Sequence, residues 1–176
     1  MSRALRDELR QQKPFASLHE EAYLNLSRTE AVLSDGIDGV LAPTGLSLTQ
    51  YNVLRMLRGA GKGGLCRNEI RDRLITRMPD VTRLLDRMEE AGLVSRVRSS
   101  VDRRMVTTTL TNEGLALVDS LDGRIDAAHA RQLGHLSSNQ LESLVALLTL
   151  ARHPSTQAPS RVATSRSTTL ARRARR

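Results

Sequence analysis

The chain has 176 residues, of which 39% are hydrophobic and 26% charged, the proportions of an ordinary soluble globular protein. Its single cysteine, Cys66, excludes an internal disulfide framework and a cysteine-rich zinc site. The sequence has no apolar run of about 18 residues, and its N-terminus lacks the apolar core of a secretory signal. We therefore expect a cytoplasmic protein.

Charge is the first positive indication of function. Lysine and arginine total 27 against 19 acids, giving a net charge of +8 and a pI near 11.0, which favours a polyanionic partner. Residues 153–176 carry six arginines and no acid, so residues 1–152 hold only +2. Phe15, Tyr23 and Tyr51 are the only aromatic residues, too few for recognition by stacking on single-stranded bases or RNA.

Two helices are expected before residue 60. Apolar residues recur at helical spacing over residues 18–41, and Pro43 then breaks the pattern. Ser47 and Gln50 have the spacing of a capping box, which predicts the start of the second helix. The glycine-rich residues 59–64 end this helix in a flexible loop, and they lack the lysine-hydroxyl ending of a phosphate loop.

Two further helices follow at residues 67–75 and 77–91. Pro79 fits the first turn of the second one, where no N–H donor is needed. Gly92 follows the last periodic residue and is expected to cap the C-terminus of that helix.

The hydrophobic period then changes from helix to strand. Residues 94–98 and 104–110 read as two strands joined by a polar hairpin tip. Thr111 is expected to cap a long helix, and Ser137 with Gln140 forms a second capping box before a last helix that Pro154 ends. Residues 153–176 have too little apolar content to fold and read as a disordered basic tail.

The helix at 77–91 has one apolar face and one charged face. Placing its apolar residues inward leaves Arg83 and Arg87 four positions apart on an exposed face, within reach of base edges or phosphates in a major groove. The hairpin brings Arg98, Arg103 and Arg104 to the same side, where an arginine-bearing wing suits the narrow minor groove. Alternatively, Arg83 is a solvated residue that pairs with a neighbouring acid, Asp80 or Asp86.

The run from Val81 to Val94, followed by Asp102-Arg-Arg104 and Leu110-Thr111-Asn-Glu-Gly114, resembles the MarR family of bacterial transcriptional regulators. The resemblance covers residues 18–152, and its most specific part is the wing pattern at positions 102, 104, 110 and 111. It implies a mainly helical winged helix-turn-helix fold with a small β-hairpin wing and a helical dimerisation region. The implied segments are an arm and dimerisation helix (1–42), a DNA-binding domain (43–110), C-terminal dimerisation helices (111–152) and the basic tail (153–176).

The resemblance also implies a homodimer that binds a pseudo-palindromic duplex site. We expect this homodimer on the nucleoid, and we expect it to repress by occluding a promoter, since blocking RNA polymerase requires only occupancy. The resemblance further implies that Arg104 enters the minor groove and that Asp102 orients it through a charge-assisted hydrogen bond. Thr82, Arg83 and Arg87 fall on the recognition helix. Arg77 falls near its start, where the family usually has a small hydroxyl residue, so the role of Arg77 stays open.

Members of this family commonly release DNA when a small phenolic or anionic ligand enters a crevice between the dimerisation helices and the winged domain. Candidates with polar tips near that crevice are His19, Tyr23 and Arg55, whereas Tyr51 lies in an apolar stripe and reads as core. His129 and His135 have no accompanying cluster of metal-ligating residues, so neither a metal nor a cofactor is expected.

Cys66 has two interpretations. At a helix start beside Arg67 it would favour the thiolate and make the protein a redox-responsive regulator, but a small buried hydrophobe is the interpretation we favour. The redox-sensing branch of the family carries its reactive cysteine near the start of the first helix, where this chain has Phe15.

Other classes of function fit the sequence less well than a specific regulator does. No nucleophile elbow, metal-ligand spacing or nucleotide fingerprint is present, so we do not expect an enzyme. A nonspecific architectural nucleic-acid-binding protein would depend on the tail rather than on Arg83 and Arg104. A winged helix that binds a protein partner instead of DNA is the third class.

Overall fold

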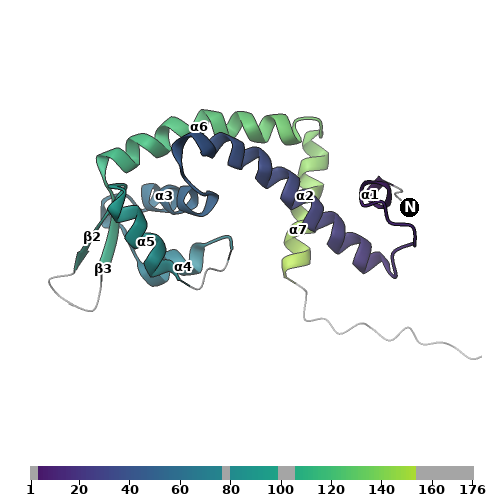
Figure 1. Ribbon diagram of the computed structural model, residues 1–176, viewed down its shortest axis with the longest axis horizontal. Helices are drawn as coiled ribbons and strands as arrows, with labels where there is room; N and C mark the ends of the chain where they lie inside the picture. Colours follow the sequence, from purple (N-terminus) through teal and green to yellow (C-terminus); the bar gives the residue numbers. More distant parts are fainter. Residues whose placement is uncertain (1–3, 77–79, 99–105, 154–176) are drawn as a thin grey trace, which may run out of the picture. The chain divides into compact units, whose positions relative to one another are not determined.

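A 24-residue helix, α2 (Leu18–Leu41), precedes the winged part of the chain (Figure 1). The computed structural model describes residues 4–76, 80–98 and 106–153. It divides into two compact units, residues 1–135 and 136–176. The first unit contains the elements from α1 (Ala4–Glu8) to α6 (Asn112–Leu133), and the second contains α7 (Ser138–Arg152).

The winged part follows α2 through the 3-10 turn η1 (Ala42–Thr44). Its elements, in chain order, are α3 (Leu48–Ala60), the 3-10 turn η2 (Gly61–Gly63), β1 (Leu65–Cys66), α4 (Arg67–Arg73), α5 (Val81–Glu90), β2 (Val94–Arg98) and β3 (Val106–Leu110). This order confirms the predicted mainly helical winged helix-turn-helix. Residues 59–64 differ from the expected flexible loop, because α3 continues through Gly59 and Ala60 and the next three residues form η2.

The wing has three strands, one more than the predicted hairpin. Strands β2 and β3 pair antiparallel with Val94 opposite Leu110, and β1 pairs with the other edge of β3, with Leu65 opposite Thr108. A strand of two residues is too short to give an alternating pattern, so the sequence does not predict β1. β1 ties the start of α4 to the wing.

Capping explains where several helices begin. The Ser47 hydroxyl accepts a hydrogen bond from the Gln50 backbone N–H, and the Gln50 side-chain oxygen accepts one from the Ser47 backbone N–H. Ser137 and Gln140 form the same reciprocal box before α7, and Thr111 accepts from the Gly114 N–H before α6. These three predicted caps are confirmed.

The C-terminus of α5 is closed around Gly92, as expected. The Gly92 N–H donates to the carbonyl of Glu89 and the Leu93 N–H donates to that of Met88, the pair of bonds of a Schellman motif. Gly92 has a φ of +71°, which a residue with a side chain rarely adopts. The chain thereby turns from α5 directly into β2.

One hydrophobic core joins the end of α2 to the winged part. Its fully buried side chains include Leu41, Leu54, Leu57, Ile70, Leu84, Leu85, Met88, Val118 and Leu121. By contrast, Leu18, Tyr23 and Leu26 in the first half of α2 are exposed. The apolar stripe predicted along α2 is therefore buried by this chain only over its last turns, at Ile37, Val40 and Leu41.

Polar bonds fix α6 against α2 and α3. The Gln132 side chain donates to the Leu33 carbonyl, and the Arg124 guanidinium donates to the Val40 carbonyl. Arg58 on α3 contacts two carboxylates of α6, at 2.7 Å from Asp119 and at 2.7 and 3.0 Å from Asp122. Ion pairs as well as apolar packing therefore attach the winged part to α6.

Within the described ranges, no helix has both the length and the apolar character needed to cross a bilayer. The predicted disordered tail at residues 153–176 lies outside the described residues except for His153.

Candidate nucleic-acid interface

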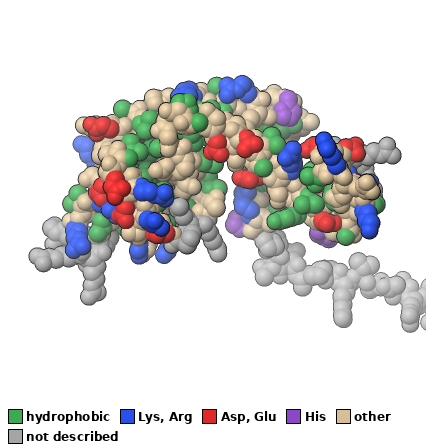
Figure 2. Space-filling view, viewed as in Figure 1, with side chains coloured by type: hydrophobic (Ala, Val, Ile, Leu, Met, Phe, Trp, Pro, Cys, Tyr) green, Lys and Arg blue, Asp and Glu red, His purple; other side chains and the backbone are tan. Residues whose placement is uncertain are grey.

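Helix α5 presents opposite faces to the core and to solvent. Val81, Leu84, Leu85 and Met88 are at most 5% exposed, whereas Thr82, Arg83 and Arg87 lie on the exposed face. Basic side chains gather on the side of the molecule that α4 and α5 present in Figure 2, with carboxylates beside them. An apolar face that fixes the helix and a basic face that is free are what insertion into a DNA groove requires.

The start of α5 differs from the sequence prediction. The helix begins at Val81 rather than at residue 77, and Asp80 is its N-cap, whose carboxylate accepts from the Arg83 backbone N–H at 2.9 Å. A negative charge at this position also suits the positive end of the helix dipole. Asp80 is therefore occupied at the backbone and does not pair with the Arg83 side chain.

The alternative interpretation of Arg83, as a partner of an adjacent acid, does not match the geometry. Asp86 contacts Arg96 instead, and the Arg87 side chain donates to the Arg83 carbonyl at 3.3 Å. Among the residues that the structure describes, no carboxylate forms an ion pair with the guanidinium of Arg83 or Arg87. Both cations are therefore available to an external anion.

The remaining predicted contacts belong to the wing and to the segment before α5. Arg98 is exposed at the last position of β2, opposite Val106 on β3. Arg77, Asp102, Arg103 and Arg104 lie outside the described residues. Their roles stay predictions from the sequence.

Sequence reasoning missed Arg96. Its side chain leaves β2 and contacts both Asp86 and Glu89 on α5, and hydrogen bonding to Glu89 raises the pKa of the guanidinium further. A signal was present, because Arg96 shares a strand face with Val94, which is buried. An arginine on a core-facing position of a strand indicates a partner beneath it.

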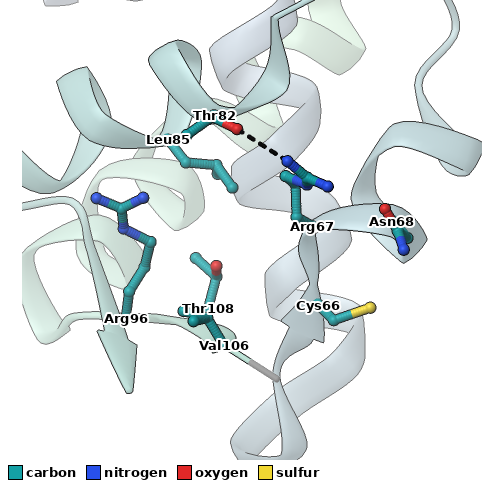
Figure 3. Close-up of a pocket in the computed structure, with 8 residues that line it drawn as sticks. All are labelled: Cys66, Arg67, Asn68, Thr82, Leu85, Arg96, Val106 and Thr108. Carbon is teal, nitrogen blue, oxygen red and sulfur yellow. Dashed lines mark hydrogen bonds between the residues drawn. The ribbon is translucent and has the colours of Figure 1, made fainter. Parts of the chain in front are cut away.

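A cavity of about 400 Å³ lies between α4, α5 and the wing (Figure 3). Arg96 stands on one side of it and Arg67 on the other, where Arg67 contacts the Thr82 hydroxyl at 3.4 Å. Thr108 on β3 is buried here. The sequence indicates Arg67 only as a neighbour of Cys66, whereas the structure connects it to the exposed face of α5.

Cys66 occupies the N-cap position of α4 as a half-buried free thiol. The Glu69 carboxylate accepts from the Cys66 backbone N–H at 2.7 Å, and this bond lowers the pKa of Glu69. The position predicted for Cys66 is confirmed, and its redox behaviour stays a hypothesis.

The three predicted ligand-binding residues are not brought together within the chain. His19 and Tyr23 are exposed near the start of α2, whereas Arg55 lies on α3, which packs near the other end of α2 (Figure 1). The Arg55 guanidinium lies 5.8 Å from the centre of the Tyr51 ring. Tyr51 is buried, as expected for a core residue, and burial raises the pKa of its hydroxyl.

A second, more open hollow of about 430 Å³ lies along α3, lined by Asn52, Arg55, Met56, Arg58, Gly59 and Ile75. Within the described part of the chain, no group of three or more histidine, cysteine, aspartate or glutamate side chains could hold a metal ion.

Together, the exposed arginine face of α5 and the antiparallel wing define a winged helix-turn-helix DNA-binding protein. Residues 44–105 match the model of the MarR family, and the chain is 33% identical over 115 residues to the HTH-type transcriptional repressor Rv2887 of Mycobacterium tuberculosis, covering 65% of this chain and 81% of that protein. The chain belongs to the MarR family and is a DNA-binding transcriptional regulator, which agrees with the expectation that it is not an enzyme.

Solved structures support the same assignment. A MarR transcription factor from Planctomyces limnophilus is 40% identical, with a TM-score of 0.60, over 78% of this chain and 99% of that one. The complex of Staphylococcus aureus MepR with DNA is 25% identical, with a TM-score of 0.68, over 74% of this chain and 95% of that one. The fold predicted from the sequence is therefore confirmed.

Proposed function

We propose that the protein is a homodimeric repressor in the bacterial cytoplasm that binds a pseudo-palindromic promoter site and blocks RNA polymerase by occupying it. The observation that carries this proposal is the exposed pair Arg83 and Arg87 on α5, opposite a fully packed face. Two such helices in a dimer would enter successive major grooves about 34–36 Å apart. That Rv2887 is a transcriptional repressor supports the same sign of regulation.

The wing completes the proposed interface. Arg98 at the end of β2 would contact the sugar-phosphate backbone of the DNA beside the major groove. Arg104, oriented by Asp102, would enter the adjacent minor groove, a role that rests on the sequence resemblance alone. Arg103 would add a phosphate contact, and Arg77 a contact near the start of α5.

Dimerisation is supported by exposed apolar side chains on α2 and α7. Leu18, Tyr23 and Leu26 on α2 and Val145, Leu147 and Leu150 on α7 are exposed, several of them by more than 60%. Exposed apolar side chains in such number on two helices are typical of an interface. A second copy of the chain is the proposed occupant.

Release by a small phenolic or anionic ligand is the proposed mode of regulation. CouR of Rhodococcus jostii, 26% identical with a TM-score of 0.66 over 82% of this chain and 100% of that one, is bound to p-coumaroyl-CoA. In this chain the hollow along α3 offers the Arg55 guanidinium to an anionic ligand, whereas Arg58 is paired with Asp119 and Asp122. Arg55 is its proposed anchor, and His19 and Tyr23 stay candidates that would require a partner subunit to approach it.

The proposal is tested by selecting binding sites from a random duplex library at physiological salt. Full-length protein and a version ending at His153 are compared, and Arg83→Ala is included for each. A shared pseudo-palindromic site that both lengths select, and that Arg83→Ala fails to select, is the expected result. Binding that is indifferent to sequence and disappears with residues 154–176 would mean that charge alone is the function.

A further inference from the structure

Arg96 is built into the wing but held by the helix beneath it. Its backbone N–H donates to Glu89 at 2.9 Å, and its Nε donates to the other oxygen of the same carboxylate at 2.7 Å. Its Nη2 contacts Asp86 at 2.6 Å and Glu89 at 2.7 Å. The Arg96 side chain is 24% exposed, whereas those of Asp86 and Glu89 are 43% and 37% exposed, so this clamp is partly open to solvent.

Among the described residues, the contacts of this clamp join the wing to α5 through charged side chains. The chain passes from α5 to β2 within the three residues 91–93, and the backbone turn alone leaves the angle between helix and strand to packing. A guanidinium bound through two of its nitrogens and the strand backbone fixes both distance and rotation, which a single-point contact does not. The strand that carries Arg98 would then meet DNA in one geometry relative to Arg83 and Arg87.

The charges support the same role. Asp86 and Glu89 lie three positions apart on α5, beside the cations proposed to meet DNA, and unpaired carboxylates there would repel phosphates. Arg96 neutralises them from the strand side. Because its Nε and Nη2 are engaged with these carboxylates, the guanidinium is directed toward the protein and not toward a ligand.

We propose that Arg96 is a positioning residue for DNA recognition, which fixes the wing relative to α5 through Glu89 and Asp86 and makes no DNA contact of its own. The inference rests on the proposed role of α5 as the recognition helix. It makes a prediction opposite to the one from charge alone: removing the acidic Glu89 weakens specific binding to DNA.

The test measures the ratio of the Kd for a scrambled duplex to the Kd for the selected operator. Arg96→Met and Glu89→Ala are each expected to lower this ratio at least tenfold, and the double variant to lower it no more than about twofold beyond the larger single effect. Glu90→Ala is the matched control, since it removes the same charge from the next position of α5 and, among the described residues, Glu90 makes no ion pair. It is expected to leave the ratio unchanged.

The pattern of losses across the variants decides the inference. A loss in Arg96→Met without a loss in Glu89→Ala means that Arg96 contacts DNA itself, and overturns it, as does an unchanged ratio in Arg96→Met. Circular dichroism and a Kd for the scrambled duplex within threefold of the original exclude unfolding, and Glu89→Ala carries the test where Arg96→Met does not fold. If Arg83→Ala also leaves the ratio of the two Kd values unchanged, the assignment of α5 as the recognition helix is wrong. If Arg83→Ala lowers this ratio while Arg96→Met and Glu89→Ala do not, only the proposed role of Arg96 is wrong.

Discussion

Gly114 and Gly123 lie in the same helix, α6, but in different surroundings. The Leu93 carbonyl lies over the first turn of α6, where it accepts from the Thr111 N–H, and a Cβ added at Gly114 would collide with that carbonyl. Because backbone atoms cannot move aside as a side chain can, we expect Gly114→Ala to destabilise the fold by about 1–3 kcal/mol. Urea unfolding followed by circular dichroism measures the change.

Gly123→Ala is the matched control, and its expected effect on the stability of the fold has the opposite sign. Nothing lies within 4 Å of a Cβ added at Gly123, so Gly123→Ala should stabilise the helix by about 0.4–1 kcal/mol. Equal shifts in one direction for the two variants would show that Gly114 is present for a reason other than its contact with Leu93.

At the scale of single residues, the sequence predicted those whose role depends on helix periodicity. Arg83 and Arg87 follow from four-residue spacing opposite an apolar stripe, and the structure has them exposed. The partners of Asp86 and the cap at Asp80 did not follow, because they depend on where α5 begins and on which strand crosses it. Contacts between elements carry no periodic signal.

At the scale of elements, the N-cap of α5 determines how well the recognition helix is ordered at the end proposed to meet DNA. Asp80→Ala removes the side-chain acceptor of the Arg83 N–H, so we expect a loss of about 1 kcal/mol in unfolding free energy. Asp80→Asn keeps an acceptor and should cost at most a few tenths. Chemical denaturation of both variants checks this, and an equal loss in both would assign the effect to charge rather than to capping.

The ion pairs between Arg58 on α3 and two aspartates on α6, Asp119 and Asp122, make the free energy of unfolding depend on pH. Hydrogen bonding to Arg58 lowers the pKa of Asp122 from its ordinary 3.8, so the folded state favours the charged carboxylate. The resulting stability is fully present above that ordinary value and is lost as pH falls through the lower pKa of the folded state.

We therefore expect Asp122→Asn to have a lower Tm than the original protein above about pH 5, because the carboxylate is then fully charged. The difference should shrink as pH falls below 4 and Asp122 becomes protonated in the original protein. Thermal unfolding from pH 7 to pH 3 tests this. A difference in Tm that is constant with pH would mean that the carboxylate contributes through packing alone.

The sequence predicted the helices and missed one strand, for a physical reason. Ser47, Thr111 and Ser137 are local signals, since each satisfies N–H groups within its own turn. The strand β1 exists only through its pairing with β3, far along the chain. The exposed first half of α2 has a related cause, because an apolar stripe shows that a face is to be covered and does not show which chain covers it.

At the scale of the whole molecule, the proposed dimer makes the exposed apolar residues of α7 a point of sensitivity. Leu147 is 65% exposed, and burial of a glutamate against a second chain would cost far more than burial of leucine. We expect Leu147→Glu to weaken self-association at least tenfold, measured by sedimentation equilibrium. Unchanged self-association of Leu147→Glu would mean that this part of α7 does not form the interface.

The basic tail adds a prediction that separates affinity from specificity. If the six arginines of residues 153–176 neutralise phosphates, each contact releases counterions, and the slope of log K against log salt steepens by about 0.9 per phosphate. A protein ending at His153 should then bind both operator and scrambled duplex more weakly at low salt, with a shallower slope and an unchanged ratio between the two. Measuring both duplexes by fluorescence anisotropy from 50 to about 300 mM salt covers the range in which such contacts are screened. An unchanged slope would show that the tail does not touch the duplex, and a lower ratio would mean that it contributes to reading the site.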